Sequence, residues 1–266
     1  MSAFKEKVFC IVSRIPEGRF FSYKKVAEMA GKKRAARAVG NILAKSKNKN
    51  IPCHRVIKSN NFVGKYFGKE SLSYLKLALL LKEGVIGVIP TDTIYGICTS
   101  ALKENSVKEI YKLRKRNPQK PMIILISEIE DLNIFGAKPT KKEIEFLNKI
   151  WPGRVSVVFK IKDKSKKEKF KYLIGKGDSL AFRVPQNNLL RKILNISGPL
   201  VAPSANYEGK EPAKNIQEAK RYFKDRVVYF DKGTLKGKPS TLIFFEKGKV
   251  KILREGADFK KVLRLI

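Results

Sequence analysis

The stretch "LSYLKLALLLKEGVIGVIPTDT" (residues 72–93) separates two parts of the chain with different patterns. Residues 72–82 carry too many apolar side chains for a one-sided helix, which predicts a buried helix that packs against both parts and leaves no flexible linker. Residues 85–90 form a short apolar strand that runs into polar residues. Before this stretch the pattern is helical, and after it helical and strand-like runs alternate over nearly 200 residues. The alternation is typical of an α/β domain built around a twisted sheet.

The sequence therefore predicts two domains, a small helical one at 1–70 and an α/β one at 71–266. In the first, residues 4–15 have apolar side chains at helical spacing. Ser22 is expected to cap the next helix, "YKKVAEMA", which should stop at Gly31. Residues 34–46 supply a further short helix, and the pair is a helix-turn-helix candidate, so we expect a winged-helix-like domain. The lysine-rich stretch 160–173 is expected to be a surface loop.

Composition bounds the partners and the compartment. The chain has 58 Lys and Arg against 24 Asp and Glu, a net charge of +34, which favours nucleic acid as a partner, although a lysine-rich proteome would give the same excess. Three cysteines without a CxxC pair and a single histidine predict neither a disulfide framework nor a Cys/His metal site. Without an apolar run of about 20 residues or a signal peptide, we expect a cytoplasmic protein with no membrane contact.

The stretch "NIPCHRVI" (residues 50–57) places Cys53 beside His54, the only histidine. A thiolate is the nucleophilic form of cysteine, so a reactive cysteine needs a base or a positive charge nearby. The alternative is a small buried thiol beside an incidental ring. Cys10 and Cys98 lie in an amphipathic helix and after a strand, where both are expected to be buried and unactivated.

The surroundings of Cys53 favour the reactive alternative. The runs "FKEKVFCIVSRIPEGRFFSYKKVAEMAG" (4–31), "AARAVG" (35–40), "IPCHRVI" (51–57) and "VGKYFG" (63–68) resemble the C-terminal domain of the alkylguanine-DNA alkyltransferases. These repair proteins flip an alkylated guanine out of the duplex and transfer its alkyl group to a cysteine. The resemblance implies DNA binding and DNA repair by this domain, with methylated-DNA–protein-cysteine methyltransferase activity.

The same resemblance assigns individual roles. Cys53 would accept the alkyl group and His54 would relay its proton through water. Arg37 would fill the gap left by the flipped base, Tyr23 would press on the neighbouring phosphate, and Tyr66 would lie in the base pocket. The family's closing K-x-x-L-L-x-x-E-G appears three residues late as "KLALLLKEG" (76–84), which makes Glu83 a candidate third member of the relay. A nucleic-acid-binding tether that only retains the cysteine is the alternative.

The α/β part carries polar motifs after its strands, where small ligands bind in open α/β sheets. "PTDT" (90–93) follows the first strand, and "LRKRNPQKP" (113–121) gathers cations suited to a polyphosphate. "GKPST" (237–241) has Pro239 where a Walker loop needs its hydroxyl, so any nucleotide must be held by side chains and irregular turns.

Seven motifs together resemble the YrdC-like family of threonylcarbamoyl-AMP synthases, in the order that the family has them. They are "PTDTIYG" (90–96), "KRNPQKP" (115–121), "WPGRVSVVF" (151–159), "AFRVP" (181–185), "APSAN" (202–206), "PSTLI" (239–243) and "ILREGA" (252–257). The resemblance implies a YrdC-like twisted-sheet fold and a nucleotidyltransferase. That enzyme would convert L-threonine, bicarbonate and ATP, with Mg²⁺, into threonylcarbamoyl-AMP and pyrophosphate. The product serves the threonylcarbamoyl-adenosine modification of tRNA.

The resemblance also implies the site and the partners. The residues that would hold threonine are Thr93, Arg183, the backbone at Ala202, and Ser240. Those that would hold ATP are Arg116, Lys120, Ser179, Ser204 and Arg254, with Asn206 in support. Expected partners are double-stranded RNA or tRNA and a downstream threonylcarbamoyl transferase. Leu125 stands where some relatives use His, and Asp92 is only a weak candidate for a base. An RNA-binding scaffold with an inactive α/β site is the alternative from another functional class.

Overall fold

The N-terminal part is helical. The computed structural model describes residues 3–48, 50–246 and 248–266. The first helices of the chain are α1 (Ala3–Ser13), α2 (Tyr23–Met29) and α3 (Ala36–Ala44). Two short strands, β1 (Phe21–Ser22) before α2 and β2 (Val56–Ile57) after α3, pair in parallel. Ser22 caps α2 as expected, because its Oγ accepts a hydrogen bond of 3.0 Å from the Lys25 amide. Helices α2 and α3 pack together, which confirms the helix-turn-helix pair.

The remainder of the chain surrounds one mixed sheet. Within the described residues its strand order is β11-β10-β6-β7-β5-β8-β4-β3-β9. The strands are β3 (Gly87–Pro90), β4 (Tyr95–Ser100), β5 (Ile123–Leu125), β6 (Val155–Lys160), β7 (Ser179–Arg183), β8 (Leu200–Val201), β9 (Val228–Tyr229), β10 (Thr241–Glu246) and β11 (Lys249–Arg254). Strands distant in the chain become neighbours, so residues of β4, β5, β7 and β10 can contribute to one site.

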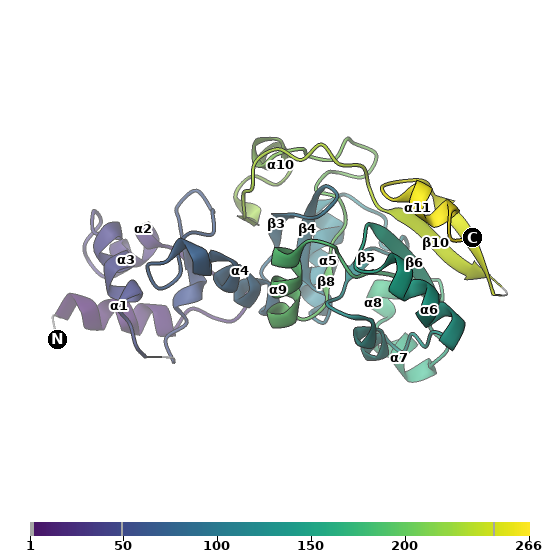
Figure 1. Cartoon of the computed structure of the whole chain (residues 1–266). Helices are drawn as coiled ribbons and strands as arrows, with labels where there is room; N and C mark the ends of the chain where they lie inside the picture. Colours follow the sequence, from purple (N-terminus) through teal and green to yellow (C-terminus); the bar gives the residue numbers. More distant parts are fainter. Residues whose placement is uncertain (1–2, 49, 247) are drawn as a thin grey trace.

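Helices cover the sheet and reach both of its ends (Figure 1). They are α4 (Ser73–Lys82), α5 (Glu104–Leu113), α6 (Lys141–Ile150), α7 (Lys164–Lys169), α8 (Lys171–Ile174), α9 (Asn188–Ser197), α10 (Ile216–Phe223) and α11 (Phe259–Leu263). The expected loop at 160–173 is wrong, because α7 and α8 form there. The Asp163 side chain caps α7 by accepting from the Lys166 amide, a local bond that offsets the repulsion between lysines. No described helix has the length and apolar character needed to span a bilayer.

Helix α4 joins the two parts, as its composition predicted. Leu77 and Leu80 are fully buried in a cluster with residues of α9, such as Ile193. Leu75 and Leu79 pack against the separate apolar cluster of the N-terminal helices. One helix therefore contributes to two cores, and the chain passes from one part to the other without a free linker.

A second connection runs from the N-terminal part to the edge of the sheet. The Val63 amide donates to the Tyr229 carbonyl at 2.9 Å, and the Tyr229 amide donates to the Asn61 carbonyl at 2.9 Å. The Asn61 side chain donates to the carbonyls of Asp225 and Val227 at 2.8 and 3.3 Å. Residues before position 70 thus extend the sheet beside β9. The division at residue 70 stays a prediction, because α4 and the pairing of residues 61–63 with Tyr229 both join the two parts across it.

Candidate functional sites

A cavity of about 250 Å³ opens where β3, β4, β5, β7, β8 and β10 come together. Seven of the residues expected to bind threonine or ATP line this cavity: Thr93, Arg116, Arg183, Ala202, Ser204, Ser240 and Arg254. They come from segments spread over 162 positions of the chain, between 93 and 254. The structure therefore gathers most of the candidate site in one place.

The "PTDT" turn is held by its own hydroxyls. The Thr91 and Thr93 hydroxyls lie 2.9 Å apart, and the Thr91 hydroxyl also donates to the Ile94 carbonyl at 2.6 Å. The Thr91 oxygen in turn accepts from the amides of Thr93 and Ile94. The bond to the Ile94 carbonyl occupies the one proton of Thr91, so Thr93 is left as the donor of the pair.

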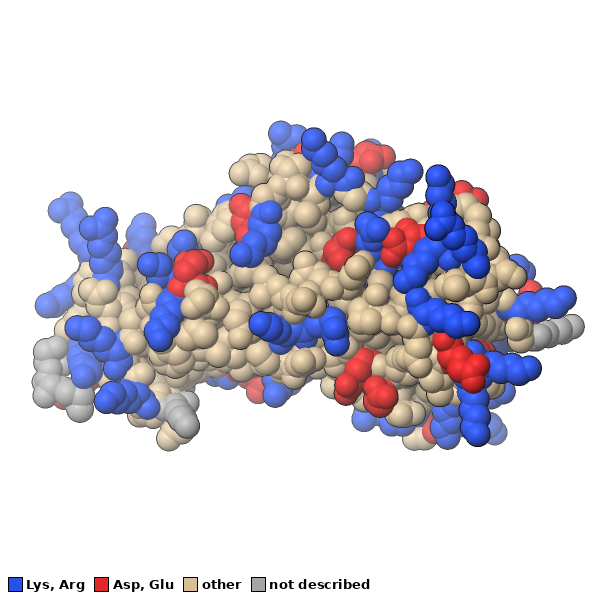
Figure 2. Space-filling model, viewed as in Figure 1, with Lys and Arg blue, Asp and Glu red and all other residues tan. Residues whose placement is uncertain are grey.

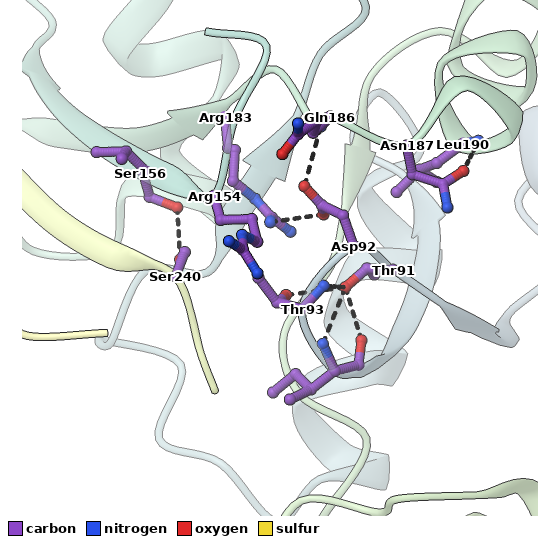
Figure 3. A network of polar contacts seen from close by, with 12 residues as sticks. Thr91, Asp92, Thr93, Arg154, Ser156, Arg183, Gln186, Asn187, Leu190 and Ser240 are labelled. Atoms are coloured by element: carbon purple, nitrogen blue, oxygen red, sulfur yellow. Dashed lines mark hydrogen bonds and ion pairs between the residues drawn. The ribbon is translucent and has the colours of Figure 1, made fainter. Parts of the chain in front are cut away.

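Arg183 and Asp92 form a buried ion pair beneath the cavity (Figure 3). The Arg183 Nη1 lies 2.7 Å from one Asp92 oxygen, and the other oxygen accepts from the Gln186 amide at 2.9 Å. The Arg183 side chain is only 4% exposed, and its Nε has no hydrogen-bond partner among the described atoms. Burial lowers the pKa of Arg183, which Asp92 opposes. Asp92 thus orients a cation rather than standing free as a base.

Ser240 and Arg254 line another part of the same cavity. The Ser240 hydroxyl lies 2.8 Å from the Ser156 hydroxyl, and Arg254 Nη2 donates to the Ser240 carbonyl at 2.7 Å. Burial and the nearby Arg183 charge lower the pKa of Arg254. Two guanidiniums that repel one another in a cavity indicate a site built for an anion.

Arg114 belongs to the cationic cluster at 113–121 that the sequence analysis described, but it was not among the residues expected to hold ATP; it lines the same cavity. Its Nη2 donates to the Ser204 hydroxyl at 3.2 Å and to the Asn206 side-chain oxygen at 3.3 Å, while its Nη1 is buried without a partner among the described atoms. Burial, with the Arg116 charge, lowers the pKa of Arg114 to about 10, so it remains a cation at neutral pH. The available signal was the R-x-R spacing with Arg116.

Three expected ATP contacts do not line the cavity. Lys120 is 60% exposed and pairs with Glu208 at 2.9 Å. Asn206 is buried behind the wall, where its side chain donates to the Tyr207 carbonyl and accepts from Arg114. Ser179 lies at the start of β7, beside Lys160 of β6. Arg116 does line the cavity, and its guanidinium donates to the carbonyls of Lys120 and Pro121.

A second cavity, of about 620 Å³, lies in the N-terminal part. It is formed by α2, α3, the loop at 58–68 and α4. The expected DNA contacts Tyr23, Arg37 and Tyr66 line it together with Cys53. Cys53 begins the short helical turn η1 (Cys53–Arg55) and is 4% exposed. The buried thiol therefore lines the same cavity as the candidate DNA contacts.

Glu83 organises the residues next to Cys53. The His54 Nε2 and a Glu83 oxygen lie 2.8 Å apart, and Arg55 donates from Nη2 and Nε to the same carboxylate at 2.8 and 2.9 Å. Burial raises the pKa of Glu83, but the bonds from His54 and Arg55 outweigh it and lower the value to about 2. A carboxylate charged at every physiological pH fixes the orientation of the ring.

Lys76 is a feature that the sequence analysis did not identify. It lies in α4, is 1% exposed, and lines the cavity that holds Cys53. Its Nζ donates to the Tyr23 hydroxyl at 3.2 Å and to the Val56 carbonyl. Burial lowers the pKa of Lys76 to about 8, while Cys53 opposes the shift. Burial likewise raises the pKa of the Cys53 thiol, and the Lys76 charge counters that rise.

The other two cysteines differ from each other. Cys98 is buried, and burial raises the pKa of its thiol, as expected of an unactivated residue. Cys10 is exposed, so the expectation of burial was wrong. Only one face of α1 is covered, by Val8 and Val12, and Cys10 lies on the other face.

Two family models match the chain. Residues 79–256 match the Sua5/YciO/YrdC model, described as "Telomere recombination". Residues 3–85 match the model described as "6-O-methylguanine DNA methyltransferase, DNA binding domain". The two matches overlap at residues 79–85, which is the end of α4 and the turn after it.

Curated proteins and solved structures agree with the first match. The chain is 33% identical over 181 residues to the threonylcarbamoyl-AMP synthase of Pyrococcus abyssi, covering 66% of this chain and 52% of that protein. It is 32% identical over 181 residues to the threonylcarbamoyl-AMP synthase of Marinobacter nauticus, covering 65% and 93%. The chain thus spans about half the length of the first and nearly all of the second.

A structure of P. abyssi Sua5 carrying two substitutions has a TM-score of 0.68 at 27% identity, covering 74% of this chain and 61% of that one. The structure of P. abyssi Sua5 complexed with L-threonine has a TM-score of 0.63 at 27% identity, covering 70% and 55%. The chain therefore belongs to the Sua5/YciO/YrdC family, and its residues 3–85 match the model of the 6-O-methylguanine DNA methyltransferase DNA-binding domain.

Proposed function

We propose that the α/β cavity makes threonylcarbamoyl-AMP from L-threonine, bicarbonate and ATP. The observation that carries this proposal is the meeting of Thr93, Arg183, Arg254 and Ser240 in one cavity. Curated relatives named threonylcarbamoyl-AMP synthases support it. In this proposal the product passes to a separate threonylcarbamoyl transferase that modifies tRNA.

In this proposal, different residues of the cavity bind threonine and ATP. Arg183, oriented by Asp92, pairs with the carboxylate of threonine, while the Thr93 hydroxyl meets its amine or hydroxyl group. Arg116, Arg254 and the unpartnered nitrogen of Arg114 offset the charge of the triphosphate. The neutral amine of threonine and bicarbonate combine with loss of water to give a carbamate. A carbamate oxygen then attacks the α-phosphorus, and the bond to the leaving pyrophosphate breaks. Catalysis rests on positioning and fixed positive charge.

Magnesium fits this scheme as part of the substrate, bound to ATP. The described residues that line the cavity include no Asp or Glu, and Asp92 is committed to Arg183 and the Gln186 amide. Magnesium prefers carboxylate and phosphate oxygens. The protein's own contribution to charge neutralisation is therefore assigned to its arginines.

The test is threonylcarbamoyl-AMP formation by the purified chain with threonine, bicarbonate, ATP and magnesium. Arg116→Ala and Ser204→Ala should each lower turnover ten- to a hundredfold, since a lost charge-assisted contact costs about 1.5–3 kcal/mol. Arg114→Ala should do the same. Lys120→Ala is the matched control outside the cavity, with an expected change below about threefold. Full turnover in the cavity variants would refute the site.

We further propose that Cys53 accepts an alkyl group from guanine in DNA. The observation that favours this function is the position of the thiol in a cavity that Tyr23, Arg37 and Tyr66 also line, beside the His54–Glu83 pair. A base inside a duplex cannot reach this thiol without leaving the stack. Because burial keeps the thiol protonated, deprotonation must accompany transfer, with His54 as the acceptor through a water.

Intact-mass spectrometry after incubation with duplex DNA that contains an alkylated guanine tests this proposal. One alkyl group should be added per chain, at Cys53 and not at the exposed Cys10. Arg37→Ala should slow transfer from duplex more than transfer from a free alkylated base, because only the duplex needs its gap filled. His54→Ala should slow both. An unmodified chain that still binds DNA tightly would establish the tether alternative instead.

A further inference from the structure

The buried lysine on α4 is not used by alkyl transfer as described above. Lys76 is one of the largest fully buried side chains of the molecule, and its charge is paired with no carboxylate among the described residues. Its partners are a phenol and a carbonyl, those of Tyr23 and Val56. An ammonium group in such surroundings loses much of its hydration, so the protonation equilibrium shifts toward the neutral amine.

The position of this amine is as informative as its burial. Lys76 lines the 620 Å³ cavity together with Cys53, so the nitrogen borders the space proposed for a flipped nucleotide. Lys58 and Lys65 also line the cavity, but both are exposed at its rim. The cavity therefore presents one internal amine and two external ones.

A desolvated amine with a lowered pKa is the form in which lysine attacks carbonyl groups. At pH 7 a lysine of pKa about 8 is neutral in about one chain in ten. The nucleotide that brings an aldehyde carbonyl into such a cavity is an abasic one. Its deoxyribose opens to an aldehyde, and without a base the sugar itself can enter.

We propose that Lys76 forms a covalent imine with the aldehyde of an abasic site in DNA. The inference rests on the proposed entry of a flipped nucleotide, but not on alkyl transfer by Cys53. The neutral Nζ attacks the C1′ aldehyde carbon to give a carbinolamine. The carbonyl oxygen then leaves as water with both amine protons, and a C=N bond joins Lys76 to the sugar. No oxidant or reductant takes part, and hydrolysis reverses the step.

Neighbouring groups make this chemistry specific to the interior amine. Tyr23 and Cys53 border Lys76, and burial raises the pKa of both, so neither competes as an anion at neutral pH. The nearby Lys58 charge favours the neutral amine. Arg37, at the rim, is placed to fill the stack from which the sugar has rotated.

Trapping with cyanoborohydride tests the proposal. The full chain is incubated with a duplex that carries a single abasic site, the imine is reduced to a stable amine, and the adduct is located by peptide mass spectrometry. We expect one adduct per chain, at Lys76. Mapping in the unmodified protein keeps the test decisive even if a variant folds poorly. An adduct on Lys58, Lys65 or other surface lysines, or no adduct, would overturn the proposal.

Three variants sharpen the result. Lys76→Arg keeps the charge and removes the nucleophile, so trapping should fall at least about tenfold. Lys69→Arg, outside the cavity lining, is the matched control and should change trapping less than about twofold. Cys53→Ser should keep the adduct while abolishing alkyl transfer. Alkyl transfer by the unmodified protein without any Lys76 adduct would reject this inference alone and leave the proposed function standing.

The pH profile provides an independent readout. The trapping rate should rise with the neutral fraction of Lys76 and level off above a pH of about 8. An amine in open water, with a pKa of about 10.4, would give a rate that still rises by tenfold per pH unit at pH 9. A profile of the second kind would assign the adduct to a surface lysine.

Discussion

At the scale of single residues, the two cavities differ in how they hold charge. Among the described atoms, the α/β cavity pairs Arg183 with Asp92 and leaves nitrogens of Arg114 and Arg183 without partners, which suits an anionic ligand. The N-terminal cavity holds a neutral thiol and a lysine of lowered pKa, and the nearby carboxylate of Glu83 is directed at His54 and Arg55. The first arrangement binds charge, and the second favours covalent chemistry.

Asp92→Asn should weaken both threonine binding and the fold. Removing one partner of a buried pair costs about 3–5 kcal/mol, and the remaining amide bond should keep the loss near the lower value. The KM for threonine should rise at least about tenfold. Asp258→Asn is the control, because Arg154 in that pair is 44% exposed and the expected loss is below about 1 kcal/mol. Urea unfolding and threonine saturation curves measure both, and equal losses would contradict the role of Asp92.

Glu83→Gln should change how stability depends on pH. The folded pKa of about 2 lies below the ordinary 4.5, so Glu83 stabilises the fold fully above pH 4.5 and loses this contribution as the pH falls toward 2. The difference of about 2.5 between these two pKa values corresponds to about 3 kcal/mol of the free energy of unfolding at neutral pH. The variant should be less stable at pH 7 and flatter between pH 5 and 3 by chemical denaturation. Glu17→Gln, in a surface pair with Lys103, is the control that should show neither effect.

At the scale of elements, α4 has the central position. One face of the helix packs on α9 and the other on the N-terminal cluster, while its interior lysine borders one cavity and Glu83, the C-cap residue directly after the helix, fixes His54. The following segment leads through β3 into the Thr91–Thr93 turn of the other cavity. The same short segment therefore completes the first site and begins the second.

Leu80→Ala should destabilise both parts together. Leu80 is fully buried in α4, and removing its side chain from a packed core costs about 2–5 kcal/mol. Because the helix belongs to both cores, calorimetry should show one transition moved to lower temperature. Leu102→Ala removes a side chain that is 47% exposed and should have little effect. Separation of the variant's unfolding into two transitions, with one unchanged, would refute the shared helix.

At the scale of the whole molecule, the two parts form a continuous body. The strand-like pairing of Asn61 and Val63 with Tyr229 adds to the contact through α4. Basic side chains occur in groups from one end of the visible face to the other, with a few acidic ones among them, while other residues make up most of the middle (Figure 2). With a net charge of +34, a polyanion can be attracted to either part.

Limited proteolysis should not separate the two parts quickly. The region between Gly68 and Gly84 contains α4, whose burial protects it from cleavage until the chain unfolds. We expect early cuts at exposed lysines outside it, such as Lys164 and Lys169 in α7. Rapid release of two folded fragments by a cut between 68 and 84 would show that the connection is a linker.

Local signals determined much of this protein. Ser22 caps α2 through an amide three residues away, and the apolar run in α4 predicts burial whatever surrounds it. The motif residues that gather in the α/β cavity were also identified, because their short motifs resemble those of the YrdC-like family. Such features depend on neighbours along the chain, and for that reason they can be recognised in the sequence.

Only the tertiary structure decided the pairings between distant segments. Asp92 and Arg183 lie 91 residues apart in the chain, and they meet only in the folded molecule, although β5, β8 and β4 separate β7 from β3 in the sheet. The apolar run of α4 predicted a buried helix, but the position of Lys76 beside the cavity that Cys53 lines follows only from the way both faces of α4 are covered. The loop wrongly expected at 160–173 became helical, and Lys120 turned toward Glu208 rather than the cavity. Burial and charge pairing depend on which surfaces of the folded chain come into contact. Neighbouring residues in the sequence do not determine those contacts.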